Sequence, residues 1–209
     1  MNDNEPKWLA WAKSLQAIAQ NGLIFAANHF DIERYESVRV IAADIMASYT
    51  RVDKQFVLDL FNDQSGYATP KVDVRGVVFQ GDKVLLVKEV VDGCWTLPGG
   101  WADPNEMPSE AAAREVWEES GYEVKPVKLL MVYDRSKHGH EPPMPFHVYK
   151  LFFLCELVRG EVKTSMETSA VGFFGENEMP PLSLARLTPS EVVRLFEHYR
   201  NPTLLTDFD

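Results

Sequence analysis

The chain has 209 residues, of which 45% are hydrophobic and 25% charged, and its formal net charge is −10. This mixture is that of an ordinary globular protein, so it excludes a disordered chain, and the length allows one domain or a domain plus a small module. The acidic excess argues against strong nucleic-acid binding, because a protein that coats a polyphosphate backbone usually carries positive charge.

Compartment signals favour the cytoplasm. Cys94 and Cys155 form no CxxC motif and suggest no disulfide framework. Residues 1–6 lack the basic and apolar regions of a signal peptide, and no apolar run approaches membrane-spanning length. We therefore expect a cytoplasmic protein with two reduced thiols and no membrane partner.

Residues 1–65 are predicted to form a small all-α module. An apolar face recurs at helical spacing and is followed by a stop signal at Asn21-Gly22. A second helix is expected to open with Asp31 as its N-cap, and a third covers Phe56–Phe61. The polar run 62–66 and Thr69-Pro70 then break the periodicity and mark the domain boundary. The residues of the first apolar face are Trp8, Trp11, Leu15 and Ile18.

Residues 70–209 are predicted to form an α/β domain with a mixed sheet covered by helices. Its first feature is a hairpin, with strands at 72–79 and 84–87 around Gly81-Asp82. A loop at 95–100 precedes a helix over Pro108–Ser120, which Gly121 ends. Further strands are expected near 129–133, 147–157 and 171–174. Thr188-Pro189-Ser190-Glu191 is a capping box that opens the last helix.

The chemistry is concentrated in the predicted helix 108–120. Glu115, Glu118 and Glu119 lie at i, i+3 and i+4, so three carboxylates share one face. Such like charges repel one another, no lysine follows four residues away, and the adjacent Arg114 is expected to point elsewhere. Solvent can offset the repulsion if the face is open, but a divalent cation does so better, and hard oxygen ligands are those that Mg²⁺ prefers.

The preceding loop offers two more contributions to such a site. Gly99-Gly100 permits backbone conformations that are closed to other residues, which lets a carbonyl approach a cation. Glu106 lies eight residues before Arg114, and the two side chains could pair and brace the loop.

These residues together resemble the Nudix box, G-x5-E-x7-R-E-U-x-E-E-x-G-U, where U is a bulky apolar residue. The segment has Gly100, then Glu106, then Arg114-Glu115-Val116-Trp117-Glu118-Glu119-Ser120-Gly121-Tyr122. Only Tyr122 departs mildly from the pattern, where a smaller aliphatic residue is usual. The resemblance implies a Nudix α/β/α sandwich, with hydrolysis of a nucleoside diphosphate linked to a further group X.

The resemblance also implies roles for the box residues. Glu115 and Glu119 correspond to the main metal ligands, Glu118 to a further ligand or the general base, and the Gly99 carbonyl completes the metal site. Arg114 is grouped with the catalytic residues. The expected cofactor is Mg²⁺, with Mn²⁺ as an alternative. Glu167 is a rival for the general base, because the base of this family does not always lie in the box.

The resemblance extends to the N-terminal module, which is similar to the helical domain of Nudix enzymes described as ADP-ribose or CDP-choline pyrophosphatases. Arg75 is a candidate phosphate ligand. Phe146, His147 and Tyr149, with Tyr133, are candidates for a base-binding platform. Ordinary alternatives stay open, since Arg75 can lie on a solvated face and the aromatic residues can fill the core.

Other interpretations of the sequence are weaker. His138, His140 and His147 are spaced too loosely for a convincing zinc site, and the loop 134–145 around them is expected to close over substrate.

Rival functions are a nucleotide-sensing Nudix regulator without activity and an enzyme that acts on RNA ends or nucleoside triphosphates. The module is expected to make a homodimer, because a unit of about 60 residues buries little surface alone, although a cap folded onto its own catalytic domain is the alternative.

Overall fold

The computed structural model describes residues 5–209, which form two compact units that are considered separately. One unit contains the described residues up to Pro70 together with residues 144–147, and the other contains residues 71–143 and 148–209. Residues 1–4, which fall in the predicted helical module and in the stretch inspected for a signal peptide, lie outside the described residues. Within residues 5–209, no helix combines the length and the apolar character needed to cross a membrane.

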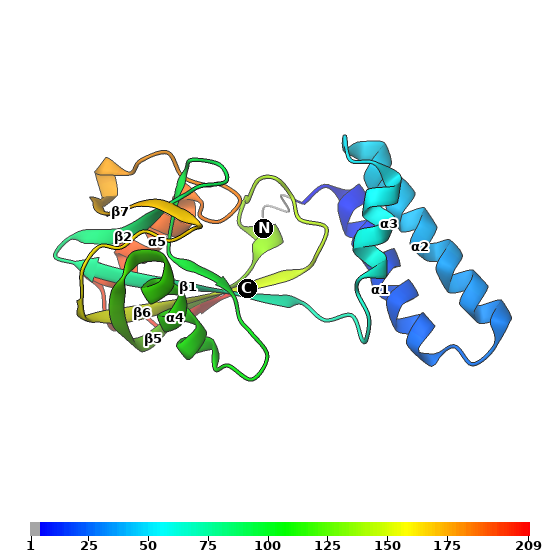
Figure 1. Ribbon diagram of the computed structural model, residues 1–209, viewed down its shortest axis with the longest axis horizontal. Helices are drawn as coiled ribbons and strands as arrows, with labels where there is room; N and C mark the ends of the chain where they lie inside the picture. Colours follow the sequence, from blue (N-terminus) through cyan, green and yellow to red (C-terminus); the bar gives the residue numbers. More distant parts are fainter. Residues whose placement is uncertain (1–4) are drawn as a thin grey trace. The chain divides into compact units, whose positions relative to one another are not determined.

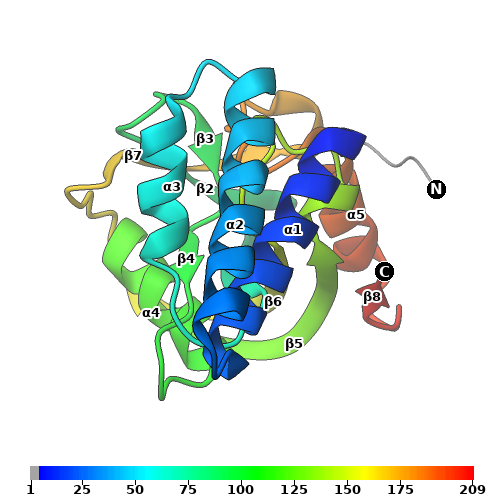
Figure 2. The ribbon, with the colours of Figure 1, turned by 90° about the vertical axis from the view of Figure 1, so that its right-hand side faces the viewer.

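Three helices make the first unit. They are α1 (Lys7–Phe25), α2 (His29–Tyr49) and α3 (Lys54–Asn62), and Figure 2 shows them side by side. Alanines at positions 12, 42 and 43 are fully buried, so α1 and α2 can approach closely. The rest of this core consists of Leu9, Met46, Val57 and Phe61.

Three sequence predictions for these helices are wrong in detail. The helix α1 continues through Asn21-Gly22, because Gly22 leaves room for a ring: a Cβ there would lie 2.2 Å from Tyr35 Cε1. The helix α2 begins earlier than expected, with Asn28 as its N-cap accepting from the Asp31 N–H. The predicted apolar face of α1 is also displaced, since Trp11 and Ile18 are exposed while Leu9 and Ala12 are buried.

The second unit is an α/β sandwich around a mixed sheet (Figure 1). The strand order is β3-β2-β1-β6-β5-β8, with β4 paired to β1 and β7 paired to β2. The strands are β1 (Lys71–Gln80), β2 (Lys83–Glu89), β3 (Trp95–Thr96), β4 (Gly99–Trp101), β5 (Tyr122–Asp134), β6 (Val148–Gly160), β7 (Thr168–Gly175) and β8 (Asp207–Phe208). The helices are α4 (Pro108–Ser120) and α5 (Pro189–Arg200), with short 3-10 turns η1 (Arg135–Lys137) and η2 (Glu176–Glu178).

The central strand β1 separates the two helices. Because side chains alternate across a strand, Val74 packs with Ala111 and Ala112 of α4, whereas Val77 packs with Leu195 of α5. The helix α4 lies very close to β1 at Gly76, where a Cβ would be 2.2 Å from Val116 Cγ2. This glycine therefore sets the position of α4 on the sheet.

The sequence predicts this unit well in its regular parts. The β1–β2 hairpin, the helix Pro108–Ser120 with Gly121 in the left-handed region, and the capping box of α5 are confirmed. The strands β5 and β6 are longer than expected, and the predicted loop 95–100 contains the short strands β3 and β4. Both cysteines are free thiols.

Candidate active site

The end of α4 places the acidic face of the helix beside the strand β4. The apolar residues Ala112 and Val116 anchor the helix on the sheet, and Gly121 ends it with φ 79°. Glu119 is consequently 95% buried, with 5% of its surface exposed, although it is a charged residue at a helix end. Glu118, one residue earlier, points outward and its side chain is 46% exposed.

The double glycine of β4 lies directly against two of the glutamates. The Gly99 N–H donates a 3.0 Å hydrogen bond to Glu119 Oε2. A Cβ on Gly100 would be 3.0 Å from Glu115 Oε1, so the Glu115 carboxylate rests on this backbone. Gly99 has φ 149°, and a Cβ there would lie 2.1 Å from the Val74 carbonyl oxygen. Glycine is therefore required for β4 to fit between β1 and the carboxylates.

Burial makes these two carboxyl groups difficult to ionise. It raises the pKa of Glu119 to about 8, against the opposing effects of Arg75 and of the Gly99 hydrogen bond. Burial also raises the pKa of Glu115, although Arg114 opposes the change. The positive charges of Arg75 and Arg114 are therefore too small an influence to keep both neighbouring carboxyl groups ionised against the effect of burial.

A hard divalent cation would supply that missing charge, and the donor set fits one. Within residues 5–209, no three His, Cys, Asp or Glu side chains already surround one point as a complete metal cage. Mg²⁺, however, typically takes one or two carboxylates and completes its shell with waters and substrate phosphates. Glu115 and Glu119, with the glycine backbone beside them, match that pattern.

Arg114 lies against the acidic face, so the expectation that it points elsewhere is wrong. It makes the predicted pair with Glu106 through a fork, Nε–Oε1 at 2.9 Å and Nη2–Oε2 at 3.0 Å. Its Nη1 also donates to Glu115 Oε1 at 2.8 Å and to Glu118 Oε2 at 3.0 Å. The long side chain curls along the helix, which residue spacing alone does not reveal, and so braces the loop and partly neutralises the acidic face.

Arg75 is buried beside the site and is already held. Its guanidinium fork pairs with Asp73 at 2.7 and 3.0 Å, and its Nη1 donates to the Leu97 carbonyl at 3.1 Å. Burial lowers the Arg75 pKa, but the Asp73 carboxylate more than compensates and the net shift is upward. Bidentate hydrogen bonding of Arg75 to a phosphate stays a prediction, and it requires the guanidinium to break its two hydrogen bonds to Asp73.

The two candidates for the general base occupy different surroundings. Glu118 is tied to Arg114. Glu167 is exposed directly before β7, and its carbonyl accepts from the Val90 N–H. The next residue, Thr168, donates through Oγ1 to the Glu119 carbonyl at 2.8 Å, which ties this segment to the end of α4.

The predicted base-binding residues fall in both units. Phe146 and His147 are part of the first unit, which contains the three helices. Tyr149 lies on β6 of the second unit and is partly exposed. Tyr133 is largely buried, with its ring stacked on His138 at 3.7 Å. The structure therefore leaves their role in substrate binding as a prediction.

The loop 134–145 is anchored in several places. His140 is buried, with Nε2 3.0 Å from Glu191 Oε1. His138 Nε2 lies 2.8 Å from Asp209 Oδ1. Arg135 is also buried and donates to the carbonyls of Ala185 and Pro142. These contacts give His138 and His140 structural partners, and closure of this loop over substrate stays a prediction.

Sequence reasoning missed one carboxylate at the site. Glu89 ends β2 and is 5% exposed, and burial raises its pKa while Arg186 opposes the shift. Arg186 Nε lies 3.2 Å from Glu89 Oε1. The only sequence signal is a carboxylate two residues after the apolar run Val84–Val87, and its partner lies nearly half the chain away.

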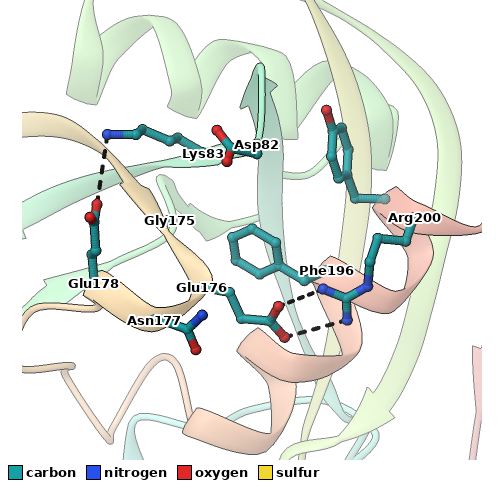
Figure 3. Close-up of a pocket in the computed structure, with 9 residues that line it drawn as sticks. Asp82, Lys83, Gly175, Glu176, Asn177, Glu178, Phe196 and Arg200 are labelled. Atoms are coloured by element: carbon teal, nitrogen blue, oxygen red, sulfur yellow. Dashed lines mark hydrogen bonds and ion pairs between the residues drawn. The ribbon is translucent and has the colours of Figure 1, made fainter.

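A separate hollow lies at the opposite end of the β1–β2 hairpin (Figure 3). It has a volume of about 330 Å³ and aromatic residues Phe196 and Tyr199 in its lining. The charged side chains at its rim pair with one another, Arg200 with Glu176 and Lys83 with Glu178. This hollow contains none of the box residues.

Two domain families match the chain. Residues 69–196 match the family described as NUDIX domain, and residues 6–61 match the family described as "UDP-X-like, N-terminal oligomerisation domain". The NUDIX match covers more than half of the chain. The chain therefore belongs to the Nudix family and is a Nudix hydrolase.

Similar proteins agree with this assignment. The chain is 44% identical over 205 residues to the Bacillus subtilis protein named "Putative ADP-ribose pyrophosphatase YjhB", covering 98% of each chain. An ADP-ribose pyrophosphatase structure from Streptococcus suis has a TM-score of 0.62 at 39% identity, covering 68% of this chain and 100% of that chain. A UDP-X diphosphatase structure has a TM-score of 0.63 at 28% identity, covering 97% and 98%.

Proposed function

We propose that this enzyme hydrolyses the diphosphate linkage of a nucleoside diphosphate joined to a second group, with Mg²⁺ as cofactor and Mn²⁺ as a substitute. ADP-ribose is the favoured substrate, and its products are AMP and ribose 5-phosphate. The observation that supports this most strongly is the pair of buried carboxylates, Glu115 and Glu119, packed against the Gly99-Gly100 backbone in an intact box.

In the proposed reaction Glu115 and Glu119 hold the cation, with the Gly99 carbonyl as a further ligand. When bound, the cation withdraws charge from the phosphate oxygens and lowers the pKa of a bound water. Arg114 holds the loop through Glu106 and keeps the glutamates in place. This bracing fixes the carboxylates before substrate arrives.

Glu167 is the proposed general base, and Glu118 a supporting residue of the acidic face. The reason is that Glu118 Oε2 already accepts a hydrogen bond from the Arg114 guanidinium, so this carboxylate is held within the acidic face. Glu167 is exposed, so it can reach a water that attacks phosphorus.

The choice of substrate is supported by the relatives rather than by the geometry. The Bacillus subtilis relative and the Streptococcus suis structure are both named as ADP-ribose pyrophosphatases. The UDP-X diphosphatase neighbour spans nearly the whole chain, which makes UDP-linked compounds the second candidate. CDP-choline belongs in the same comparison because it has the same diphosphate linkage.

The helical unit is proposed to join two copies of the chain. Its matching family is described as an oligomerisation domain. Its surface exposes large apolar side chains, which favour an interface over water. These are Trp11, Ile18, Phe25, Phe30, Ile41, Tyr49 and Phe56.

The experiment that tests the site compares single carboxamide variants with Mg²⁺ and ADP-ribose. We expect Glu119→Gln to lower turnover by roughly 10³-fold or more, since a ligand of the cation is lost. The matched control is Glu110→Gln in the first turn of the same helix, which should retain activity. Glu167→Gln should lose more activity than Glu118→Gln, and the opposite order would make Glu118 the base.

A further inference from the structure

Arg186 is a half-exposed cation fixed beside the acidic site. Its Nε lies 3.2 Å from the buried carboxylate of Glu89, and its Nη1 lies 4.0 Å from Asp92 Oδ2. The Arg186 side chain is nevertheless 32% exposed. A guanidinium has five N–H donors in a planar fork, so this arrangement orients the group and leaves donors for a ligand.

The loop that carries Arg186, residues 181–187, is anchored through several of its carbonyls. The Trp95 N–H donates to the Pro181 carbonyl, and the Leu187 N–H donates to the Ser183 carbonyl. The buried Arg135 donates to the Ala185 carbonyl through both Nε and Nη2. These hydrogen bonds restrict the backbone of the loop 181–187, so they fix the position of the Arg186 Cα, from which the side chain extends.

A buried ammonium completes this support. Lys150 on β6 is 1% exposed, and its Nζ donates to the Arg186 carbonyl at 2.6 Å. It also contacts Glu191 Oε1 at 3.0 Å and His140 Nε2 at 3.1 Å. The two oxygens accept two of the three ammonium donors, and His140 Nε2 accepts the third in the tautomer whose Nδ1–H donates to the Leu184 carbonyl. Burying a charge is costly unless it is paired and all its hydrogen bonds are made. One of the hydrogen bonds of Lys150 is made to the backbone of Arg186, so the buried ammonium helps to hold that residue in place.

Glu89 links this arrangement to the box. It lies opposite Thr168 in the β2–β7 pairing, and the Thr168 hydroxyl donates to the Glu119 carbonyl at 2.8 Å. The next residue after Glu89, Val90, donates its N–H to the Glu167 carbonyl at 2.9 Å. Arg186 therefore approaches the same space as the proposed cation ligands and the proposed base. It comes from a part of the chain that lies outside the box and is not among the residues singled out in the sequence.

We propose that Arg186 is a substrate-binding residue that contacts the diphosphate group, oriented by Glu89 and by the anchored loop 181–187. The inference deepens the proposed function and rests on it for the substrate class. Planar, bidentate recognition of phosphate is the chemistry in which arginine exceeds lysine. Arg186 would act together with the cation at Glu115 and Glu119, each taking a share of the diphosphate charge.

The test measures binding without turnover. Magnesium imidodiphosphate, whose bridging nitrogen resists hydrolysis, is titrated by calorimetry into the full chain and four variants. These are Arg186→Gln, Arg186→Lys, Glu89→Gln and the double variant Glu89→Gln/Arg186→Gln. Arg200→Gln is the matched control, since Arg200 is also paired with a glutamate but lies at the separate hollow.

We expect Arg186→Gln to weaken binding about 10- to 100-fold, the range for losing a charge-assisted contact. Arg186→Lys should give an intermediate loss, and Arg200→Gln no change. The loss should persist in the Glu89→Gln background, because the contact is with the ligand. A loss that disappears there would show that Arg186 only neutralises Glu89 and would overturn the inference, as would wild-type protein that does not bind the probe.

The outcome is separable from that of the proposed function. If ADP-ribose is not hydrolysed but imidodiphosphate binding depends on Arg186, the diphosphate contact stands and the substrate assignment fails. If ADP-ribose is hydrolysed and Arg186→Gln binds the probe normally, the enzyme assignment stands and the role of Arg186 fails. Thermal melting of each variant checks that the fold is retained.

Discussion

The Gly99 N–H donates a 3.0 Å hydrogen bond to the Glu119 carboxylate, across twenty positions of the sequence. This bond joins the glycine loop to the end of α4, so the backbone and the acidic face of the box form one unit. This neutral donor and the charge of Arg75 do not offset the burial of the carboxyl group, so the pKa of Glu119 stays raised. The arrangement therefore prepares the site for a cation.

The backbone requirement predicts that Gly99→Ala disrupts the site. A Cβ at position 99 would lie 2.1 Å from the Val74 carbonyl oxygen, and φ 149° is nearly closed to alanine. We expect activity to fall at least about 100-fold and the melting temperature to fall as β4 moves away from β1. The measurement is steady-state kinetics alongside thermal unfolding.

Gly93→Ala is the control for that substitution. Gly93 also has a positive φ, 69°, but an added Cβ would meet nothing within 4 Å. Its cost should be about 1–2 kcal/mol of stability, with activity largely kept. Equal damage from the two substitutions would contradict the specific role of Gly99.

The raised pKa of Glu119 predicts an unusual dependence of stability on pH in the metal-free protein. Burial raises this pKa from 4.5 to about 8, so between these values the folded protein binds a proton that the unfolded chain has released. The contribution of Glu119 to stability is therefore complete below about pH 4.5 and is lost as the pH rises towards 8. Urea unfolding in EDTA at several pH values measures this loss.

Two comparisons isolate the cause. Added Mg²⁺ should restore stability most strongly near pH 8, because it binds the ionised carboxylates. Glu119→Gln should reduce the pH dependence, leaving the contributions of Glu115 and Glu89, whose pKa values are also raised, and should weaken the Mg²⁺ effect. A variant that keeps the same slope and the same Mg²⁺ response as the natural sequence would mean that Glu119 is neither the titrating group nor a ligand.

The exposed apolar residues of the helical unit predict a homodimer. Light scattering after gel filtration should give twice the chain mass of 23.8 kDa. Replacing Trp11 and Ile18 together by serine should shift the protein to monomer, since both side chains are exposed on α1. Leu205→Ser, at an exposed position of the catalytic unit, should leave the mass unchanged. A natural chain that is monomeric at micromolar concentration would refute the dimer.

The sequence allowed the regular parts of the fold to be predicted, because each rests on local chemistry. Thr188 and Glu191 form their capping box within four consecutive residues, and Gly121 ends α4 through its own backbone freedom. Gly22 shows the limit of local signals, since it resembles a helix stop but serves as a contact point for Tyr35. Only the packing of two helices decides between these roles.

Some residues of the candidate site could be predicted from local spacing, and others could not. Glu115, Glu119 and the Glu106–Arg114 pair follow from fixed spacing within one segment. Glu89 and Arg186 do not, because their meeting depends on the fold bringing the end of β2 to a distant loop. The curl of Arg114 onto Glu115 is a side-chain conformation, which spacing does not determine.

The central claim is most directly tested by incubating the purified chain with Mg²⁺ and equal concentrations of ADP-ribose, CDP-choline, a UDP-sugar and a nucleoside triphosphate. Products are identified by chromatography and ³¹P NMR, with Glu119→Gln as the inactive reference. We expect ADP-ribose to be cleaved fastest, to AMP and ribose 5-phosphate, only when the divalent cation is present. Faster hydrolysis of the triphosphate, or equal cleavage by Glu119→Gln, would contradict the account.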